Sequence, residues 1–133
     1  MPNSNAATIS APARSILVVD DNDDVRDAMV VALRVAGYEA ESAENGAVAL
    51  ARLRNDGLRP SLILLDLMMP EMDGLEFREQ QLRDAALAAI PVVIVSAFGR
   101  QTAVRALGVA DYLAKPIDFS RLLEIVAQYC RPA

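Results

Sequence analysis

Length, composition and charge exclude several classes of protein. The chain has 133 residues, 53% of them hydrophobic, which suits a single packed domain. Thirteen basic and eighteen acidic residues give a net charge of -5, which argues against nucleic acid or an anionic membrane surface as a partner. The single cysteine, Cys130, excludes a disulfide framework and fits a reducing cytosol. We expect a cytoplasmic protein whose partners are proteins.

The N-terminal residues do not resemble a targeting signal. They lack the basic start and the apolar stretch of a signal peptide, so we expect residues 1–14 to be a disordered lead-in. The longest apolar stretch, residues 85–95, is interrupted by Pro91 and is shorter than the roughly 18 to 20 residues that span a bilayer. We expect one domain over residues 15–130 and no output domain.

Three runs of four residues are continuously apolar, as strands buried on both faces of a parallel sheet should be. These runs are residues 16–19, 62–65 and 92–95. Weaker strands fit residues 38–42 and 111–114. Five such strands predict a sheet with buried central members.

Apolar residues recur at helical spacing between and after these strands. The four groups are Val25, Ala28, Met29 and Ala32; Ala47, Leu50 and Ala51; Leu82, Ala85 and Ala86; and Phe119, Leu122, Leu123 and Val126. Asp23 and Asp118 are in place to cap helix N-termini, and Gly37 and Gly57 to follow helix C-termini. Strands that alternate with helices predict an α/β fold, an open parallel sheet covered on both faces.

Polar residues stand at the end of each strong strand. Asp20 and Asp21 close the first, Asp66 and Ser96 close two more, and Lys115 follows the last. In open α/β sheets the ligand site lies outside the carboxyl ends of the strands, so we expect these side chains to meet at one rim. Three gathered carboxylates need a counter-charge, and Mg²⁺ suits oxygen ligands that leave room for water and phosphate.

Each of these residues has a simpler interpretation when it is taken alone. The acidic run at residues 20–24 could be a solvated turn that caps a helix. Asp66 could be a turn residue, Ser96 could satisfy a nearby backbone group, and Lys115 could be a surface lysine. The simpler interpretations must hold at four separate strand ends, whereas one shared site explains all of them.

Other phosphate and metal sites fail at the same residues. A calcium loop beginning at Asp20 would need Gly at position six and Glu at position twelve, and the chain has Val25 and Val31 there. Neither G-x-G-x-x-G nor G-x-x-x-x-G-K-[ST] occurs, which excludes the common dinucleotide and P-loop motifs. The absence of histidine argues against zinc hydrolysis and Ser-His catalysis.

From about residue 15 to residue 129, the chain resembles the receiver domains of two-component response regulators. Four segments carry the resemblance: ILVVDD at 16–21, DLMMPEMDG at 66–74, SA at 96–97 and DYLAKP at 111–116. The resemblance implies a flavodoxin-like, chemotaxis-regulator-like fold. Its doubly wound five-stranded parallel sheet has the order 2-1-3-4-5 and carries about five helices.

The resemblance also implies roles for the strand-end residues. Asp66 is the phosphoacceptor, which takes a phosphoryl group from a phosphohistidine of a sensor histidine kinase or a histidine phosphotransfer protein. Asp21 and Asp66 bind Mg²⁺ directly, Asp20 binds it through water, and the backbone carbonyl of Met68 completes the protein ligands. Lys115 pairs with a phosphoryl oxygen, and charge that is placed in advance stabilises the transfer.

A two-state switch is the implied output. Ser96 bonds the phosphoryl group in one conformation only, and Tyr112 then rotates inward behind it; the simpler alternative for Tyr112 is half-buried packing. A downstream protein would read the surface of the fourth helix, fifth strand and fifth helix. The interval from Ser96 to Lys115 is a few residues shorter than the family pattern, so we expect a short fourth helix.

Three smaller features follow from the same segments. The bond between Lys115 and Pro116 is a candidate cis peptide. Gly74 is expected to permit the turn into the next helix. The methionines Met68, Met69 and Met72 are expected to fill gaps between strand and helix.

Two other functions remain as alternatives. A degenerate receiver that serves as a docking module would lack the acceptor or an acid, and both are present. A metal-dependent aspartyl phosphatase would need a second Asp two residues past the nucleophile, where this chain has Met68. We therefore expect a signalling switch that catalyses its own phosphorylation and dephosphorylation. It would be either a stand-alone regulator or a receiver excised from a longer polypeptide.

Overall fold

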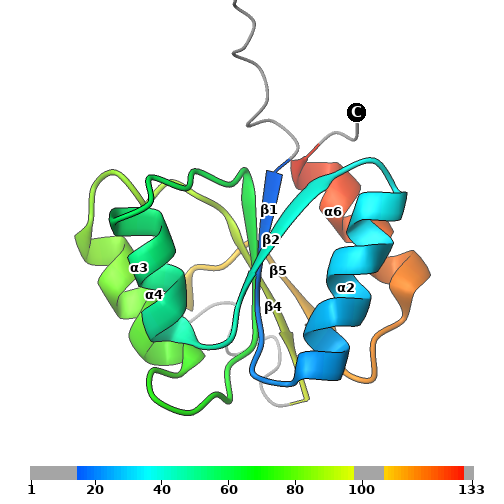
Figure 1. The fold of residues 1–133 in the computed structure, drawn as a ribbon, viewed down its shortest axis with the longest axis horizontal. Coiled ribbons are helices and arrows are strands. Elements are labelled where there is room, and N and C mark those ends of the chain that lie inside the picture. The colour runs from blue at the N-terminus through cyan, green and yellow to red at the C-terminus, as the bar shows by residue number, and fades with distance from the viewer. Residues whose placement is uncertain (1–14, 98–106, 131–133) are drawn as a thin grey trace, which may run out of the picture.

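A five-stranded parallel sheet has helices on both of its faces (Figure 1). The computed structural model describes residues 15–97 and 107–130. The strands are β1 (Ser15–Val19), β2 (Glu39–Ala43), β3 (Leu62–Leu65), β4 (Val92–Ser96) and β5 (Asp111–Ala114). The described helices are α2 (Asp23–Val35), α3 (Gly46–Arg54), α4 (Gly74–Arg83) and α6 (Phe119–Tyr129). The order β2-β1-β3-β4-β5, with every neighbouring pair parallel, confirms the predicted flavodoxin-like sheet.

The central strands separate two hydrophobic cores. Helices α2 and α6 cover one face of the sheet, and α3 and α4 cover the other (Figure 1). Because side chains alternate along a strand, Ile16 and Val18 pack with α2 and α6, whereas Leu17 and Val19 pack on the opposite face. All four are fully buried. This two-sided burial is why the central strands are continuously apolar.

The weaker strands lie at the two edges of the sheet. β5 matches its predicted residues, and β2 begins one residue later than predicted. Along β2, Ala40 and Ala43 are buried while Glu39 is exposed. An edge strand has a weaker apolar pattern because part of it faces solvent.

Side chains cap the helix N-termini, with one correction to the sequence interpretation. Asn22 caps α2, because its side chain accepts a hydrogen bond from Val25 N at 3.0 Å; Asp23 is the first helical residue. Asp118 caps α6 as predicted. The two residues Gly37 and Gly57 have φ of 101° and 70° after α2 and α3, which fits their predicted place beyond the helix ends.

The predicted position of the third helix is wrong. Leu82 lies in α4, but its side chain is 50% exposed. Ala85 and Ala86 are exposed and lie beyond the end of the helix. The buried residues of α4 are Gly74, Phe77, Arg78 and Gln81. Two of these four are polar, so the spacing of apolar residues predicted the wrong buried face for this helix and placed the helix too late in the chain.

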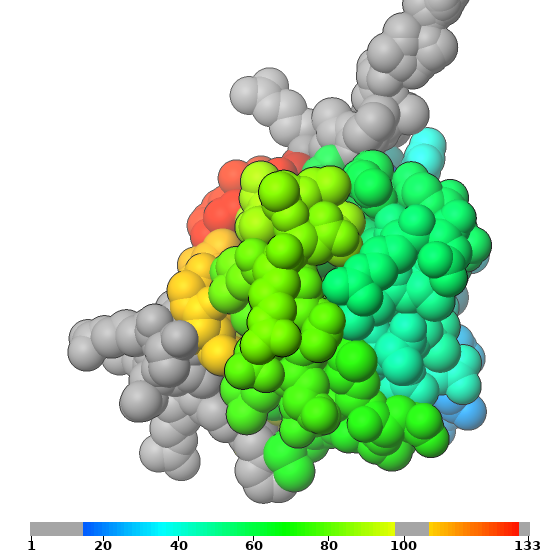
Figure 2. Space-filling model, turned by 90° about the vertical axis from the view of Figure 1, so that its left-hand side faces the viewer, coloured from blue at the N-terminus to red at the C-terminus, as the bar shows by residue number. Residues whose placement is uncertain are grey.

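A buried arginine connects α4 to the entry of β5. Arg78 is 7% exposed, and its guanidinium donates to the carbonyls of Leu107 at 2.9 Å and Gly108 at 3.0 Å and to Gln81 Oε1 at 2.7 Å. Burial lowers the pKa of Arg78, yet each of its three side-chain nitrogens has an oxygen acceptor. The residues that lead into β5, yellow-orange in Figure 2, lie beside α4.

Gln81 extends this network to the loop before β4. Its side chain is fully buried, and Nε2 donates to the carbonyls of Leu87 at 2.9 Å and Ile90 at 3.0 Å. Buried polar groups are stable only when they are hydrogen-bonded. The Arg78–Gln81 pair therefore fastens two loops to one helix through backbone carbonyls.

Two predicted features lie on residues outside the described ranges, whereas the predicted cis peptide lies inside them. The lead-in at residues 1–14 and most of the short fourth helix, at residues 98–106, lie outside residues 15–97 and 107–130. The peptide between Lys115 and Pro116 is cis, as predicted. Among the described helices, none is both long enough and apolar enough to cross a bilayer.

Replacement of Gly74 by alanine tests how closely α4 approaches the end of β3. A Cβ added at Gly74 would lie 2.5 Å from the carbonyl oxygen of Asp66 and 2.8 Å from Leu67 Cα. Backbone atoms yield little, so Gly74→Ala should lower the free energy of unfolding by about 1–3 kcal/mol. Helix propensity alone would give the opposite sign. Urea denaturation measures the change, and Glu79→Ala, at an exposed position of the same helix, should stay within about 0.5 kcal/mol.

Replacement of Arg78 tests the tether between α4 and β5. Arg78→Met keeps the apolar stem but leaves two carbonyls and Gln81 Oε1 without their donor, which should lower the free energy of unfolding by about 1–3 kcal/mol. The control is Arg83→Met, at an exposed position of the same helix. An equal loss in both variants in urea denaturation would show that the buried network contributes nothing specific.

Candidate functional site

The predicted site residues meet at the carboxyl ends of the strands. Asp20 follows β1, Asp66 follows β3, Ser96 ends β4 and Lys115 follows β5. One oxygen from each of Asp20, Asp21 and Asp66 lies within 4.8 Å of the others. This edge of the sheet holds most of the charged groups that the sequence pattern singled out.

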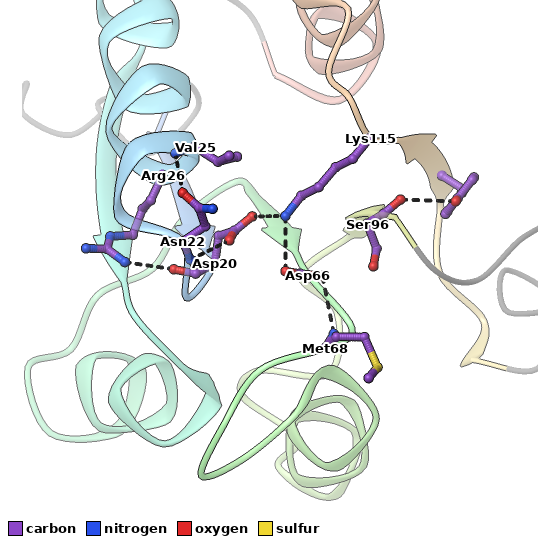
Figure 3. A network of polar contacts seen from close by, with 9 residues as sticks. Asp20, Asn22, Val25, Arg26, Asp66, Met68, Ser96 and Lys115 are labelled. Carbon is purple, nitrogen blue, oxygen red and sulfur yellow. Dashed lines mark hydrogen bonds and ion pairs between the residues drawn. The ribbon is translucent and has the colours of Figure 1, made fainter.

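Lys115 bridges two buried carboxylates (Figure 3). Its Nζ lies 2.7 Å from Asp20 Oδ2 and 3.1 Å from Asp66 Oδ2. Asp20 is fully buried and Asp66 is 5% exposed. Buried carboxylates are costly without a cation beside them, so this ammonium makes the arrangement possible.

Burial and charge act in opposite directions on the pKa values of this group. Burial raises the pKa of Asp20, the hydrogen bonds from Lys115 and Asn22 lower it, and the Asp66 charge raises it; the pKa is raised overall. Burial lowers the pKa of Lys115, but the hydrogen bond to Asp20 and the charges of Asp66 and Asp20 raise it further, so the net shift is upward. Lys115 is therefore cationic at neutral pH.

Hydrogen bonds hold three polar atoms of Asp20 in addition to the ion pair at Oδ2. Its N–H donates to Ala43 O at 3.1 Å, its Oδ1 accepts from Asn22 N at 2.9 Å, and its carbonyl accepts from Arg26 Nη1 at 2.9 Å. The sequence interpretation missed Arg26, because an arginine in a helix gives no sign that its side chain turns back to the preceding strand.

Asp66 is held at the end of β3 by three contacts. Its N–H donates to Val19 O at 2.9 Å, Oδ1 accepts from Met68 N at 3.2 Å, and Oδ2 faces Lys115. Both carboxylate oxygens therefore have a donor on the protein side of the site.

The methionines after Asp66 divide into two groups. Met69 and Met72 pack against the core, as expected. Met68 is 57% exposed and lines the pocket described below, so the expectation that it fills a core gap is wrong.

A pocket of about 600 Å³ opens above these side chains. Its lining residues are Asp21, Asn22, Asp23, Asp24, Asp66, Met68, Ala97 and Lys115. Asp23 and Asp24 begin α2 and add acidic groups to the rim. A solvated helix-capping turn is the simpler alternative that the sequence offers for this acidic run. The pocket is therefore rich in oxygen donors and strongly acidic.

The donor set suits a hard divalent cation. Asp20, Asp21 and Asp66 bring three carboxylates together, and among the described residues the Lys115 ammonium contacts two of them, Asp20 and Asp66. One ammonium leaves net negative charge at the site. Oxygen ligands beside an open pocket are what Mg²⁺ prefers, because it keeps several waters or phosphate oxygens.

Ser96 and Tyr112 lie beside this group and already contact each other. Ser96 is fully buried, and its backbone carbonyl accepts from Tyr112 Oη at 3.1 Å and from Lys115 N at 3.1 Å. Tyr112 is partly buried and packs against the core on the α3 and α4 face. The contact connects the end of β4 to β5, next to the lysine that faces Asp66.

Known proteins share this fold and sequence. Residues 16–127 match the family model of the response regulator receiver domain. The polar-differentiation response regulator DivK of Brucella anthropi is 34% identical over 119 residues, which cover 87% of this chain and 95% of DivK. RpaA of Synechocystis sp., a DNA-binding dual master transcriptional regulator, is 35% identical over 119 residues, and the match covers 87% of this chain but only 48% of RpaA.

A solved structure agrees with these matches. The response regulator TrrA of Thermotoga maritima, in complex with Mg²⁺ and BeF, superposes with a TM-score of 0.75 at 27% identity, over 87% of this chain and 98% of that one. The match to the family model covers most of the chain and includes the ends of all five strands. This chain belongs to the response regulator receiver domain family of two-component signalling.

Proposed function

We propose that residues 15–130 form a phosphoryl-accepting receiver domain in which Asp66 takes a phosphoryl group from a phosphohistidine. The observation that carries the proposal is the Asp66 carboxylate at an open pocket, 3.1 Å from the Lys115 ammonium and beside two further carboxylates. Membership of the receiver family gives this geometry a known signalling context.

The proposed chemistry is one displacement at phosphorus. An oxygen of Asp66 attacks the phosphorus atom, the bond from phosphorus to the donor histidine nitrogen breaks, and the electron pair stays on the imidazole. The product is an acyl phosphate on Asp66. Lys115 neutralises negative charge on a phosphoryl oxygen from its place between Asp20 and Asp66, so little reorganisation is needed.

The same carboxylates fit a magnesium ion. Asp21 and Asp66 would bind it directly, Asp20 through water, and the backbone carbonyl of Met68 would complete the protein ligands. When bound, Mg²⁺ supplies positive charge that offsets the charge of the phosphoryl oxygens. A similar structure, that of TrrA, is a complex with Mg²⁺ and BeF, which supports Mg²⁺ as the ion for this chain.

The proposed signal passes through Ser96 and Tyr112. The Ser96 hydroxyl would bond the new phosphoryl group, and Tyr112, whose hydroxyl lies 3.1 Å from Ser96 O, would shift with it. In this proposal the protein is cytoplasmic. It receives the group from a sensor histidine kinase or a histidine phosphotransfer protein and acts on a downstream protein, without nucleic acid or a membrane as partner.

Specific observations argue against the two alternatives. An aspartyl phosphatase needs an acid two residues past its nucleophile, and that position is the exposed thioether of Met68. A degenerate docking module would not be expected to keep a buried acceptor, two neighbouring carboxylates and the bridging lysine together.

Intact-mass measurement tests the acceptor. Incubation with Mg²⁺ and acetyl phosphate should add one phosphoryl group to the parent protein, and Asp66→Asn should abolish the adduct because an amide oxygen is a poor nucleophile. Asp56→Asn, an exposed acid after α3, is the matched control and should keep the adduct. EDTA in place of Mg²⁺ during the incubation should prevent formation of the adduct in both the parent and the control.

Three outcomes would count against the proposal. Loss of the adduct in Asp56→Asn as well would point to general damage. A persistent adduct in Asp66→Asn would place the acceptor elsewhere. A parent protein that neither binds Mg²⁺ nor gains the adduct would favour the docking module.

Unfolding with and without Mg²⁺ tests the charge balance at Asp20. The folded pKa of Asp20 is raised, so the protonated carboxyl contributes to the free energy of unfolding below the unfolded pKa. This contribution is lost as the pH rises through the folded pKa, where the buried carboxyl ionises. In EDTA at neutral pH, Asp20→Asn should therefore be more stable than the parent, and the difference should shrink as the pH falls through that raised pKa. A less stable variant at neutral pH would contradict this sign.

Added metal should stabilise the parent more than Asp20→Asn. Mg²⁺ at a hundred times its Kd should stabilise the parent by about 2.7 kcal/mol. Asp20→Asn should gain less from the same concentration, because it has lost a carboxylate from the ligand group. Urea denaturation at fixed free Mg²⁺ measures both effects.

A further inference from the structure

Arg26 is a largely buried cation that faces away from the pocket. It is the fourth residue of α2, and its side chain is 15% exposed. Nη1 donates to the carbonyl of Asp20 at 2.9 Å, and Nη2 lies 2.6 Å from Asp23 Oδ1. One guanidinium thus joins the last residue before the turn to the first residue of the helix, and a planar fork suits two such acceptors.

Asp21, a proposed magnesium ligand, lies in the chain between Asp20 and Asp23, the two residues that Arg26 contacts. Its side chain is exposed, and it makes no hydrogen bond or ion pair with the residues that the structure describes. Asp20 and Asp66 are each held by Lys115 and by a backbone N–H. The Asp21 carboxylate lies near both and is repelled by both. Its direction therefore depends on its backbone.

The backbone before Asp21 is fixed by Arg26. The peptide between Asp20 and Asp21 presents its carbonyl to Nη1, while the N–H of Asp20 is tied to Ala43 O on β2. Without the guanidinium, the hydrogen bond from Asp20 N–H to Ala43 O remains, but the Asp20 carbonyl loses its side-chain donor. The Asn22 N–H bond to Asp20 Oδ1 remains beyond Asp21, but we expect the freed peptide to rotate more easily and to let Asp21 move away from Asp66.

We propose that Arg26 is a positioning residue for the magnesium site, an inference that rests on the proposed function. In Figure 3, Arg26 and Lys115 lie on opposite sides of Asp20. Arg26 is not among the residues that line the pocket. It acts through the Asp20–Asp21 peptide and touches neither the phosphoryl group nor the acceptor.

Simple electrostatics gives the opposite expectation. A guanidinium near a cation site repels the ion, so removal of its charge should strengthen Mg²⁺ binding. Removal of a group that orients a ligand should weaken binding. The direction of the change in Kd therefore separates positioning from charge.

The structure offers a matched control on the same helix. Arg34 also lies on α2 and also donates to a backbone carbonyl six residues away, Ala40 O at 2.8 Å. That carbonyl belongs to β2, away from the candidate metal ligands. A general role of such contacts in holding α2 to the sheet would affect both arginines alike.

Isothermal titration of the full chain with MgCl₂ tests the proposal. Arg26→Met should raise the Kd for Mg²⁺ roughly tenfold, and Arg34→Met should leave it unchanged. Arg26→Lys keeps the charge but replaces the planar fork with a single nitrogen on a flexible stem, so it should also weaken binding. Urea denaturation of each variant checks that the domains compared are folded.

Each other outcome overturns a defined part of the argument. Tighter or unchanged binding by Arg26→Met, or an equal loss in Arg34→Met, would each overturn the positioning role while the proposed function stands. Wild-type affinity in Arg26→Lys would overturn only the requirement for a planar fork. Failure of the parent protein to bind Mg²⁺ would overturn the proposed magnesium site and the role of Arg26 with it.

Discussion

The ammonium of Lys115 between Asp20 and Asp66 is the contact on which the site depends. The two carboxylates end neighbouring strands, so the parallel sheet itself forces them together, and both are almost fully buried. The lysine comes from β5, which β4 separates from β3. Its long side chain reaches across the edge of the sheet and supplies charge that the interior could not otherwise provide.

One ammonium does not neutralise three carboxylates, and this imbalance gives the site its chemistry. The protein holds negative charge at the pocket at some cost in stability, and a cation or a cation with a phosphoryl group would relieve that cost. Around the pocket, rigid contacts restrain the groups that would otherwise move apart. Asp20 is held through four polar atoms, and Arg26 holds the peptide that leads to Asp21.

The sequence was a good guide wherever burial on two faces left no choice of residue type. The three central strands, their parallel order and the polar residues that end them were predicted, because a doubly covered strand must be apolar throughout and its end must meet the other ends. The same reasoning failed at α4. That helix buries Arg78 and Gln81, whose polar atoms bond to carbonyls of loops outside the helix. A local apolar pattern therefore could not predict which face of α4 is buried.

By itself, the sequence determined the α/β class, the strand order through its resemblance to receiver domains, and the identity of Asp20, Asp21, Asp66 and Lys115 as candidate site residues. Tertiary structure decided which of these charges touch. It placed Lys115 on two carboxylates, left Asp21 exposed, turned Met68 outward and brought Arg26 back onto the Asp20 carbonyl. The physical reason is range. The tendency of a residue to be buried follows from its own side-chain type, which the sequence gives directly. A hydrogen bond or ion pair between distant segments forms only when the fold has brought the two groups within a few ångströms.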